Sequence, residues 1–402
     1  MAILAVDRRG SSPLVRGRFF QPREPAFWIY LVIVGLTGSV AVGQQALFRQ
    51  ISVSGWALSW ALLALYAVPI FSLVYFLDLY EREPLPLLFA ALVWGGVAAT
   101  TLAAVANTGW GLVVARIGGP EFAARWTAAL TAPPIEETMK GLGVVMIYLI
   151  ARSEIDDAMD GFVYGAICGL GFAVVEDVFY FMGVFGGQPA GVLRGFFLRV
   201  VASGLYSHVL YSGLVGMGIG YLVSRRESRP LSQRVWLCAG LCAAAVFGHF
   251  LWDSPLLDFF PSQPWAGGDL LLVFVATAVK GLPLLGFVAI AVTLARRREL
   301  RWMRGALRSE IGKGGVTGEE LRLLESPKLR RRVRREMRRR AGGRAASLLH
   351  RLQREQLTLA MIASMVASDD DPALVRQREY CRSLRDALNA ILGAAPAETD
   401  HG

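Results

Sequence analysis

Long apolar runs separated by short polar segments fill the first three quarters of the chain. Eight such runs lie near residues 27–47, 56–77, 86–107, 126–150, 160–184, 195–223, 235–257 and 270–295. A helix that crosses a bilayer needs roughly 20 apolar residues, and each run approaches or exceeds that length. The pattern therefore predicts an all-α fold, a polytopic bundle of about eight transmembrane helices.

The composition agrees with a membrane protein. Hydrophobic residues make up 54% of the 402 residues, charged residues only 18%, and the mean hydropathy is +0.44. An ordinary soluble domain carries more charge and less apolar surface. The first run follows a basic stretch and has no small-residue cleavage site behind it, so we expect a retained helix and not a removed signal peptide.

The apolar pattern also divides the chain. We expect a cytoplasmic N-terminal segment over 1–26, a transmembrane domain over 27–295 and a basic, helical cytoplasmic tail over 296–402. Within the tail, residues 328–340 form a dense basic run, KLRRRVRREMRRR, which Gly342 and Gly343 interrupt. Such a run next to the last span can contact anionic lipid headgroups or stay solvated. We expect no nucleic-acid partner, because cytoplasmic loops and this tail account for most of the net charge of +10.

Basic residues of the short loops predict the orientation. Arginines cluster at residues 8–23, 225–234 and 296–301, whereas the alternate loops carry only Arg49, Arg116, Arg125 and Arg194. Cytoplasmic loops retain Lys and Arg, so the clustered side is cytoplasmic. We therefore expect a multi-pass protein of the cell membrane with both termini in the cytoplasm.

A few ionisable residues lie inside the predicted spans, where each is costly unless it faces a partner or water. They come from four different spans, and they are Glu136, Glu137 and Lys140 in the pattern E-E-x-x-K, Glu176, His208, and His249 with Asp253 one turn later. At about 1.5 Å of rise per residue, they all fall between the midplane and the outer third of their spans. We therefore expect them to converge on one polar pocket.

Local spacing suggests how these groups interact. Lys140 shares a helix face with Glu136, so its ammonium can pair with that carboxylate, while Glu137 points elsewhere and is free for another role. Asp253 can fix the tautomer of His249. Pro133 and Pro134 should break or kink the span beside the glutamates. Arg199, a further charge within a span, should either pair with an acidic residue or extend its guanidinium toward the membrane surface, and we expect its role to be structural.

The residue types favour hydrolysis by an activated water molecule. No G-x-S-x-G nucleophile motif occurs, and Cys168 has no basic partner in its local sequence. Coupled carboxylates beside imidazoles suit general-base chemistry near neutral pH. The four cysteines lie in spans or in the tail, so we expect no structural disulfide.

The same motifs, in the same order, resemble the PrsW-type intramembrane proteases, which are related to the CAAX-type and abortive-infection membrane proteases. The resemblance covers most of residues 60–257. It rests on DLYEREP at 78–84, E-E-x-x-K at 136–140, DGFVYG at 160–165, GFAVVE at 171–176, His208, and the turn from His249 to Asp253. Asp177 and Asp253 stand where the family often has Asn.

The resemblance implies an intramembrane endopeptidase whose partner is a membrane-embedded protein substrate, an anti-sigma factor in the best-known members, cut on the extracytoplasmic side. It leaves two mechanisms open. In one, Glu136 or Glu137 activates water without a metal, Glu176 assists, and His208 or His249 stabilises the oxyanion. In the other, His208, His249 and a glutamate, most simply Glu176, bind a zinc ion. Since no H-E-x-x-H is present, we favour the metal-free version.

Other classes of function make different predictions. A transporter or proton relay also uses intramembrane carboxylates and histidines, but it should show matching, interrupted segments in two halves, and none is evident. A non-catalytic membrane scaffold should have lost one of the paired glutamates, and both are present. The purely structural alternative is that these polar groups only join helices by hydrogen bonds.

Overall fold

The computed structural model describes residues 18–80, 82–202, 208–224, 229–257, 270–366 and 368–394. Within these ranges the regular structure is helical, and no strand occurs. The arginines of residues 8–16, together with Arg225 and Arg226, lie outside the described residues. The orientation expected from them therefore stays a prediction.

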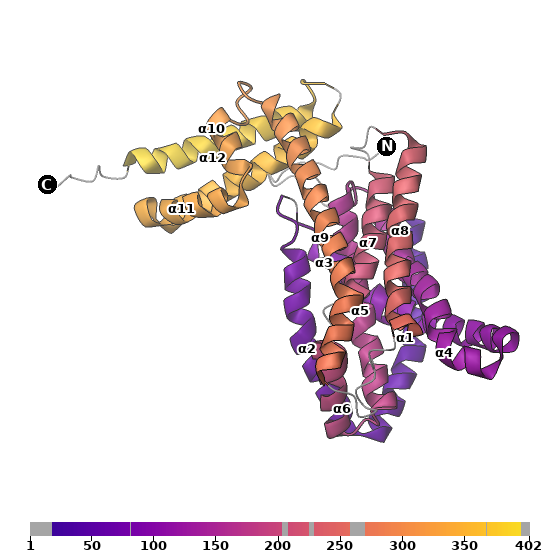
Figure 1. Cartoon of the computed structure of the whole chain (residues 1–402). Coiled ribbons are helices and arrows are strands. Elements are labelled where there is room, and N and C mark those ends of the chain that lie inside the picture. The colour runs from indigo at the N-terminus through magenta and orange to yellow at the C-terminus, as the bar shows by residue number, and fades with distance from the viewer. Residues whose placement is uncertain are drawn as a thin grey trace. The chain divides into compact units, whose positions relative to one another are not determined.

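The chain divides into two compact units, which we describe separately. The first comprises Gly17–Asp78 and Arg82–Thr293. Its helices are α1 (Pro25–Ile51), α2 (Val53–Tyr75), α3 (Leu85–Val93), α4 (Thr100–Ile150), α5 (Ala158–Phe179), α6 (Pro189–Phe196), α7 (His208–Val223), α8 (Leu231–Asp253) and the first part of α9 (Leu270–Arg308) (Figure 1). Turns of π-helix, η1 (Trp94–Ala99), η2 (Tyr180–Val184) and η3 (Phe197–Ala202), extend three of them, and the short 3₁₀ helix η5 (Pro255–Leu257) follows α8.

Six helical stretches of the described chain are long and apolar enough to cross a membrane. They are Pro25–Ile51, Val53–Tyr75, Leu85–Ile150, Ala158–Val184, Leu231–Asp253 and Thr277–Arg308, and α7 is a shorter apolar helix. Many of their large apolar side chains are exposed, including Val42, Leu65 and Leu112. Exposed apolar surface of this extent suits contact with lipid. The chain is a multi-pass, all-helical membrane protein.

Helix α4 is broken at Gly119. This residue adopts φ 81° and ψ 170°, a conformation open to glycine, and Pro120 follows it. The break divides α4 into a first arm, Thr100–Gly118, and a second arm, Pro120–Ile150. The arms fold back on each other, and Asn107 of the first arm donates a hydrogen bond to Glu136 of the second.

We expected Pro133 and Pro134 to break or kink the helix; a break is wrong, since the backbone there stays helical. Each proline removes only one backbone N–H donor, and a membrane helix tolerates the loss where neighbouring groups satisfy the carbonyl that is freed.

Glycines bring α5 and α7 into backbone contact. A Cβ atom at Gly161, Gly165 or Gly169 of α5 would overlap the main-chain oxygen of Gly216, Ser212 or His208, respectively. Small residues repeated every four positions are a common way for membrane helices to approach closely. The close approach positions the first turns of α7, which carry His208 and Ser212.

The second unit contains Leu79–Glu81 and the chain from Leu294 onward. It holds the end of α9, then α10 (Gly318–Leu324), α11 (Pro327–Met365) and α12 (Pro372–Ala394). Met303, Leu307, Leu324, Leu359 and Cys381 are among the residues of its own apolar core. A capping box of Thr317 and Glu320 begins α10, and Gly342, at φ 80°, breaks α11 after its basic run.

Candidate active site

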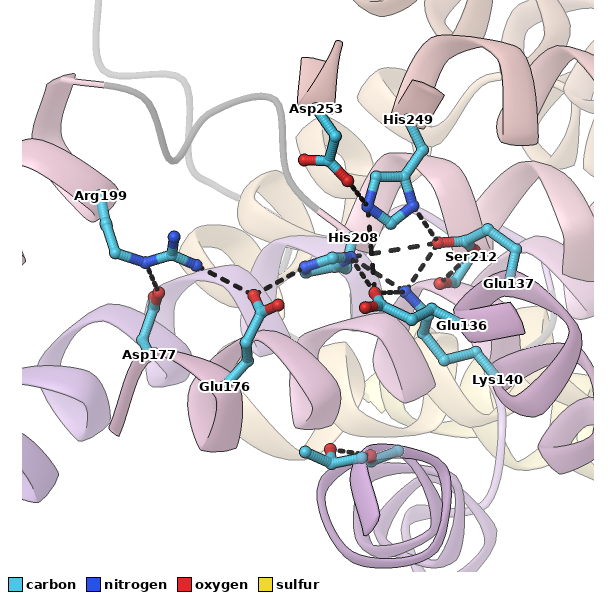
Figure 2. Close-up of polar contacts among 12 residues, drawn as sticks. Glu136, Glu137, Lys140, Glu176, Asp177, Arg199, His208, Ser212, His249 and Asp253 are labelled. Carbon is cyan, nitrogen blue, oxygen red and sulfur yellow. Dashed lines mark hydrogen bonds and ion pairs between the residues drawn. The ribbon is translucent and has the colours of Figure 1, made fainter. Parts of the chain in front are cut away.

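The intramembrane ionisable residues point toward one another, as Figure 2 shows, and most of them line one cavity. The second arm of α4 supplies Glu136, Glu137 and Lys140, α5 supplies Glu176, α7 begins at His208, and α8 ends with His249 and Asp253. The cavity has a volume of about 620 Å³, and its lining includes Glu136, Glu176, His208, His249 and Asp253. Glu137 and Lys140 lie behind this lining.

Lys140 is fully buried among carboxylates. Its Nζ lies 2.6 Å from Oε1 of Glu137 and 3.5 Å from Oε2 of Glu136. It also approaches Nδ1 of His208 at 2.9 Å and lies 4.1 Å from the ring centre of Phe172. An ammonium in this low-dielectric place is stabilised by the two carboxylates, and removing Lys140 would leave both buried carboxylates without their cation.

Glu137 is held on both oxygens. Its Oε1 accepts from Lys140 and lies 3.1 Å from Nδ1 of His249, while Oε2 accepts from the hydroxyl of Ser212 at 2.9 Å. The expectation that Glu137 is free for another role is therefore wrong. Its hydrogen bonds join α4, α7 and α8, and they fix the ring of His249.

The hydrogen-bond partners assign the tautomers of both histidines. An ammonium only donates, so Nδ1 of His208 accepts from Lys140 and the ring proton lies on Nε2, 3.0 Å from Oε2 of Glu176. In His249 the proton lies on Nδ1, facing Glu137, and Nε2 is left 3.4 Å from Oδ2 of Asp253. Each imidazole thus donates to one carboxylate and presents its other nitrogen toward Glu136.

Glu136 is the carboxylate with spare capacity. Asn107 donates to its Oε1 at 3.2 Å, but Oε2 has no hydrogen-bond partner among the described residues, although the side chain is only 6% exposed. Nδ1 of His208 and Nε2 of His249 both lie 3.9 Å from this oxygen. The Lys140 ammonium pairs with this oxygen only at 3.5 Å, so the buried carboxylate can still take a further positive or donating group.

Arg199, from η3, extends the cluster on the far side of His208. Its Nη2 donates to Oε2 of Glu176 at 2.9 Å and its Nε donates to Oδ1 of Asp177 at 2.6 Å. Its guanidinium lies 3.5 Å from the ring centre of Tyr180 in η2. The expected pairing of Arg199 with an acidic residue is confirmed, and π-helical turns such as these are frequent at functional sites.

Aromatic rings fix the imidazole planes. Tyr211 stacks on His249 with ring centres 4.7 Å apart and an interplanar angle of 4°, and Phe172 meets His208 edge-on at 4.9 Å. The two imidazole centres are 5.0 Å apart. Neither ring is free to rotate without breaking a packed contact.

Three residues of the cluster were not anticipated from the sequence, namely Asn107, Tyr211 and Ser212. Neutral polar residues carry no charge penalty in a membrane, so they do not stand out from a hydropathy profile. Ser212 could have been found from the repeat of small residues, because it lies four residues before Gly216 and faces Gly165.

The carboxylate nearest both imidazoles also differs from the one expected. Ligand atoms of Glu136, His208 and His249 lie within 4.8 Å of one another, as a metal site requires. Glu176, the carboxylate in the expected zinc set, instead bonds to the other nitrogen of His208.

Comparison with known proteins agrees with this architecture. Residues 83–282, which contain every residue of the cluster, match the model of the PrsW family intramembrane metalloproteases. About half of the chain is thus similar to the PrsW-family proteases. Protease PrsW of Bacillus subtilis (strain 168) is 26% identical over 179 residues, covering 44% of this chain and 74% of that protein. Protease PrsW of Geobacillus kaustophilus (strain HTA426) is 26% identical over 196 residues, covering 48% and 71%. No solved structure matches the chain.

Two of the PrsW-like motifs lie outside the cavity. Tyr164 of DGFVYG donates to Glu83 of DLYEREP at 2.6 Å, and Asp160 takes part in the capping box that begins α5. These motifs therefore join the segment before α3 to the start of α5, and they support the site at a distance.

Proposed function

We propose that this protein is an intramembrane endopeptidase that hydrolyses a peptide bond of another membrane-embedded protein in the cavity beside Glu136. One observation carries the proposal. Four helices bring three carboxylates and two oriented imidazoles to a single buried cavity, with one carboxylate oxygen left without a donor. The match to the PrsW-family metalloproteases supports the same reaction class.

The donor set fits a divalent metal ion, and zinc suits two imidazoles with one carboxylate. We propose Glu136, His208 and His249 as the ligands, because Oε2 of Glu136 lies 3.9 Å from both Nδ1 of His208 and Nε2 of His249. The Lys140 ammonium, which donates to Nδ1 of His208 in this structure, would move aside when the metal binds. The remaining nitrogen of each histidine faces a carboxylate, Glu137 or Glu176, which is the usual outer-shell arrangement of metal-bound histidines. When bound, the metal would supply Lewis acidity to the site.

The residues around this set have separate roles. Glu137, held by Lys140 and Ser212, orients His249, and Glu176, held by Arg199, orients His208. Glu176 and Asp253 reach the cavity and can exchange protons with water there. Lys140 also supports the metal-free alternative, since its ammonium already contacts Nδ1 of His208 and lies near Glu136, which would then be the base.

The placement in the membrane follows from the helices. Dividing Leu85–Ile150 at Gly119 and counting α7 as a span raises the six long apolar helices to eight, which would put both termini on one side of the membrane. The arginines clustered on that side make it the cytoplasmic one. We assign the protease domain to residues 27–295 and a cytoplasmic region to 296–402. Arg331, Arg332, Arg335, Arg338 and Arg339 of α11 are exposed, which supports contact of residues 328–340 with anionic lipid.

The substrate would be a membrane-anchored protein, resembling the anti-sigma factors cut by the best-known PrsW-type enzymes. The test is co-expression with candidate single-span proteins, followed by cleavage assays on purified protein. We expect Glu136→Gln and His249→Ala to abolish cleavage, while Glu121→Gln, an exposed carboxylate on the same arm of α4, leaves it unchanged. Cleavage by Glu136→Gln at the wild-type rate would refute the proposal.

Metal analysis separates the two mechanisms. We expect about one zinc ion per chain in protein purified without chelators, and its loss in His208→Ala and His249→Ala. Chelation should stop cleavage, and zinc should restore it. Cleavage by protein shown to be free of metal would overturn the ligand assignment and leave Glu136 as the general base.

A further inference from the structure

Asn107 brings a neutral amide group to the edge of the charged cluster. It belongs to the first arm of α4 and lines the same cavity as Glu136, His208 and His249. Its Nδ2 donates to Oε1 of Glu136 at 3.2 Å. A carboxylate can only accept hydrogen bonds, so the amide nitrogen must face Glu136 and the amide oxygen is turned away from it. This contact therefore fixes the orientation of the Asn107 side chain.

The amide oxygen of Asn107 is an acceptor without a donor. Oδ1 is buried and has no hydrogen-bond partner among the described residues. Burying an amide oxygen without a partner costs free energy, so such atoms are rare in folded proteins and each one calls for an explanation. An oxygen that is satisfied only when the cavity is occupied supplies that explanation.

Charged acceptors at the cavity are already engaged. Glu176 and Asp177 both accept hydrogen bonds from Arg199, and Oδ2 of Asp253 lies 3.4 Å from Nε2 of His249. A neutral donor that enters the cavity would have to compete with a cation or an imidazole for these oxygens. Oδ1 of the neighbouring asparagine is open to such a donor without that competition.

The substrate of the proposed reaction carries donors of this kind. In a helix each backbone N–H bonds to the carbonyl four residues earlier, and the side chains surround the backbone. The peptide bond to be cut must therefore leave the helix, and every N–H that is freed inside an apolar bundle needs a new acceptor. We infer that Oδ1 of Asn107 accepts a hydrogen bond from a backbone N–H of the substrate, next to the peptide bond that is hydrolysed beside Glu136.

The inference rests on the proposed proteolytic function and adds a residue that contacts the substrate. Oδ1 and Nδ2 belong to one planar amide, and an extended chain advances about 3.3 to 3.6 Å per residue, so the bound N–H lies within one or two residues of the scissile bond. A contact with the backbone accepts any side chain at that position except proline, which has no N–H.

The probe for the test is a synthetic transmembrane peptide of about 22 residues with an Ala-Gly-Ala-Gly centre, reconstituted in liposomes with the full-length protein. In a set of derivatives, one central backbone amide at a time is replaced by an ester, which removes the N–H and keeps every side chain. Wild type is compared with Asn107→Ala, with the apolar isostere Asn107→Leu, and with Thr101→Val. Thr101 lies on the same arm of α4 but is not among the residues that line the cavity.

Cleavage and binding are measured separately. kcat/KM is compared only for esters outside the scissile bond, because an ester at that bond hydrolyses more readily by itself. Affinity is measured by fluorescence energy transfer in the His249→Ala background, which we expect not to cleave and which keeps both Asn107 and Glu136. Unfolding temperatures establish that each variant is folded.

We expect one ester peptide to lose about tenfold in affinity and in kcat/KM with wild type and with Thr101→Val, because Oδ1 is again left without a donor. Asn107→Ala and Asn107→Leu lack this acceptor, so they should treat that ester peptide and the all-amide peptide alike.

An ester loss that persists in both Asn107 variants, or the absence of any ester loss with wild type, would overturn the inference. If the all-amide peptide is cleaved in that case, the proteolytic function stands without this contact. If no peptide is cleaved but the loss of affinity depends on Asn107, the proteolytic function fails and the contact stands.

Discussion

The interactions of single side chains explain how two imidazoles can be oriented in an apolar bundle. Each histidine donates to a carboxylate that is itself held by a cation, since Lys140 holds Glu137 and Arg199 holds Glu176. The fixed cation offsets the cost of a buried carboxylate, and the carboxylate fixes the tautomer. Arg199 therefore acts as a positioning residue, although it touches neither of the imidazoles.

The role of Arg199 can be tested by Arg199→Met. We expect kcat to fall roughly 100-fold, because Glu176 loses its partner and the ring of His208 shifts from its productive geometry. Arg199→Lys should recover part of the loss by restoring the charge. Arg194→Met, which removes an exposed arginine of α6, is the matched control and should retain wild-type kinetics. Equal effects of both methionine variants would contradict the assignment.

Sequence reasoning at this scale recognised the charged members of the site because a charge inside an apolar run is conspicuous. It misjudged how they pair. Glu137, three residues before Lys140, makes the shorter contact, 2.6 Å, whereas Glu136, four residues before it, lies at 3.5 Å. Helix spacing allows both pairs, and only the positions of Ser212 and His249 on other helices decide between them.

At the scale of elements, two features determine the geometry of the site, the break in α4 and the close contact of α5 with α7. The break of α4 at Gly119 lets both arms of one helix contribute, Asn107 from the first and Glu136 from the second. The glycine contacts of α5 with α7 place His208 and Ser212. The remaining helices surround this pair and supply His249 and Arg199.

The α5–α7 contact predicts a strong effect of Gly165→Ala. The added Cβ would overlap the main-chain oxygen of Ser212, so the helices must separate. Overpacking of this kind costs about 1 to 3 kcal/mol. We expect a lower unfolding temperature in detergent and reduced cleavage. Gly183→Ala, where a Cβ meets nothing within 4 Å, should change neither, and a similar loss in both variants would argue against the backbone contact.

Hydropathy found the apolar helices but not their interruptions. Residues 107–126 looked like a loop between two spans, whereas α4 continues to Gly118 and resumes at Pro120. A helix can extend through Asn107, Thr108 and Arg116 because backbone hydrogen bonds do not depend on side-chain polarity. The site of a chain reversal depends on a single positive φ, which apolar periodicity does not report.

At the scale of the whole molecule, the order of motifs along the chain was the most informative signal. The match over residues 83–282 confirms the resemblance to the PrsW family. The order of motifs is informative because residues from several helices are needed to form one cavity. The tail beyond residue 294 forms a unit with its own core, and its ion pairs give it a separate response to pH.

Glu320 provides a test of that response. Burial alone would raise its pKa, but hydrogen bonds from Arg385, the backbone of Thr317 and Gln356 hold the pKa below its ordinary value. A carboxyl with a depressed folded-state pKa contributes stability above its unfolded pKa, about 4.3, and loses it as the pH falls through the folded pKa. The contribution is therefore present at neutral pH and absent in strong acid.

We expect Glu320→Gln to weaken amide-exchange protection of α10 and α12 at neutral pH by about 1 to 2 kcal/mol, since charge-assisted hydrogen bonds are lost. The difference from wild type should narrow as the pH is lowered below about 4. Glu319→Gln changes an exposed neighbour and should match wild type throughout. A difference that stays constant with pH would show that packing, and not ionisation, accounts for the effect.

The contact between α5 and α7 has one further consequence. No layer of flexible side chains separates these helices where Gly161, Gly165 and Gly169 meet the opposing main chain. Lipids that thicken or thin the bilayer can tilt the pair as one body, but they cannot compress or spread it. We therefore expect the spacing between Glu176 and His208 to be the same in host membranes of quite different lipid composition.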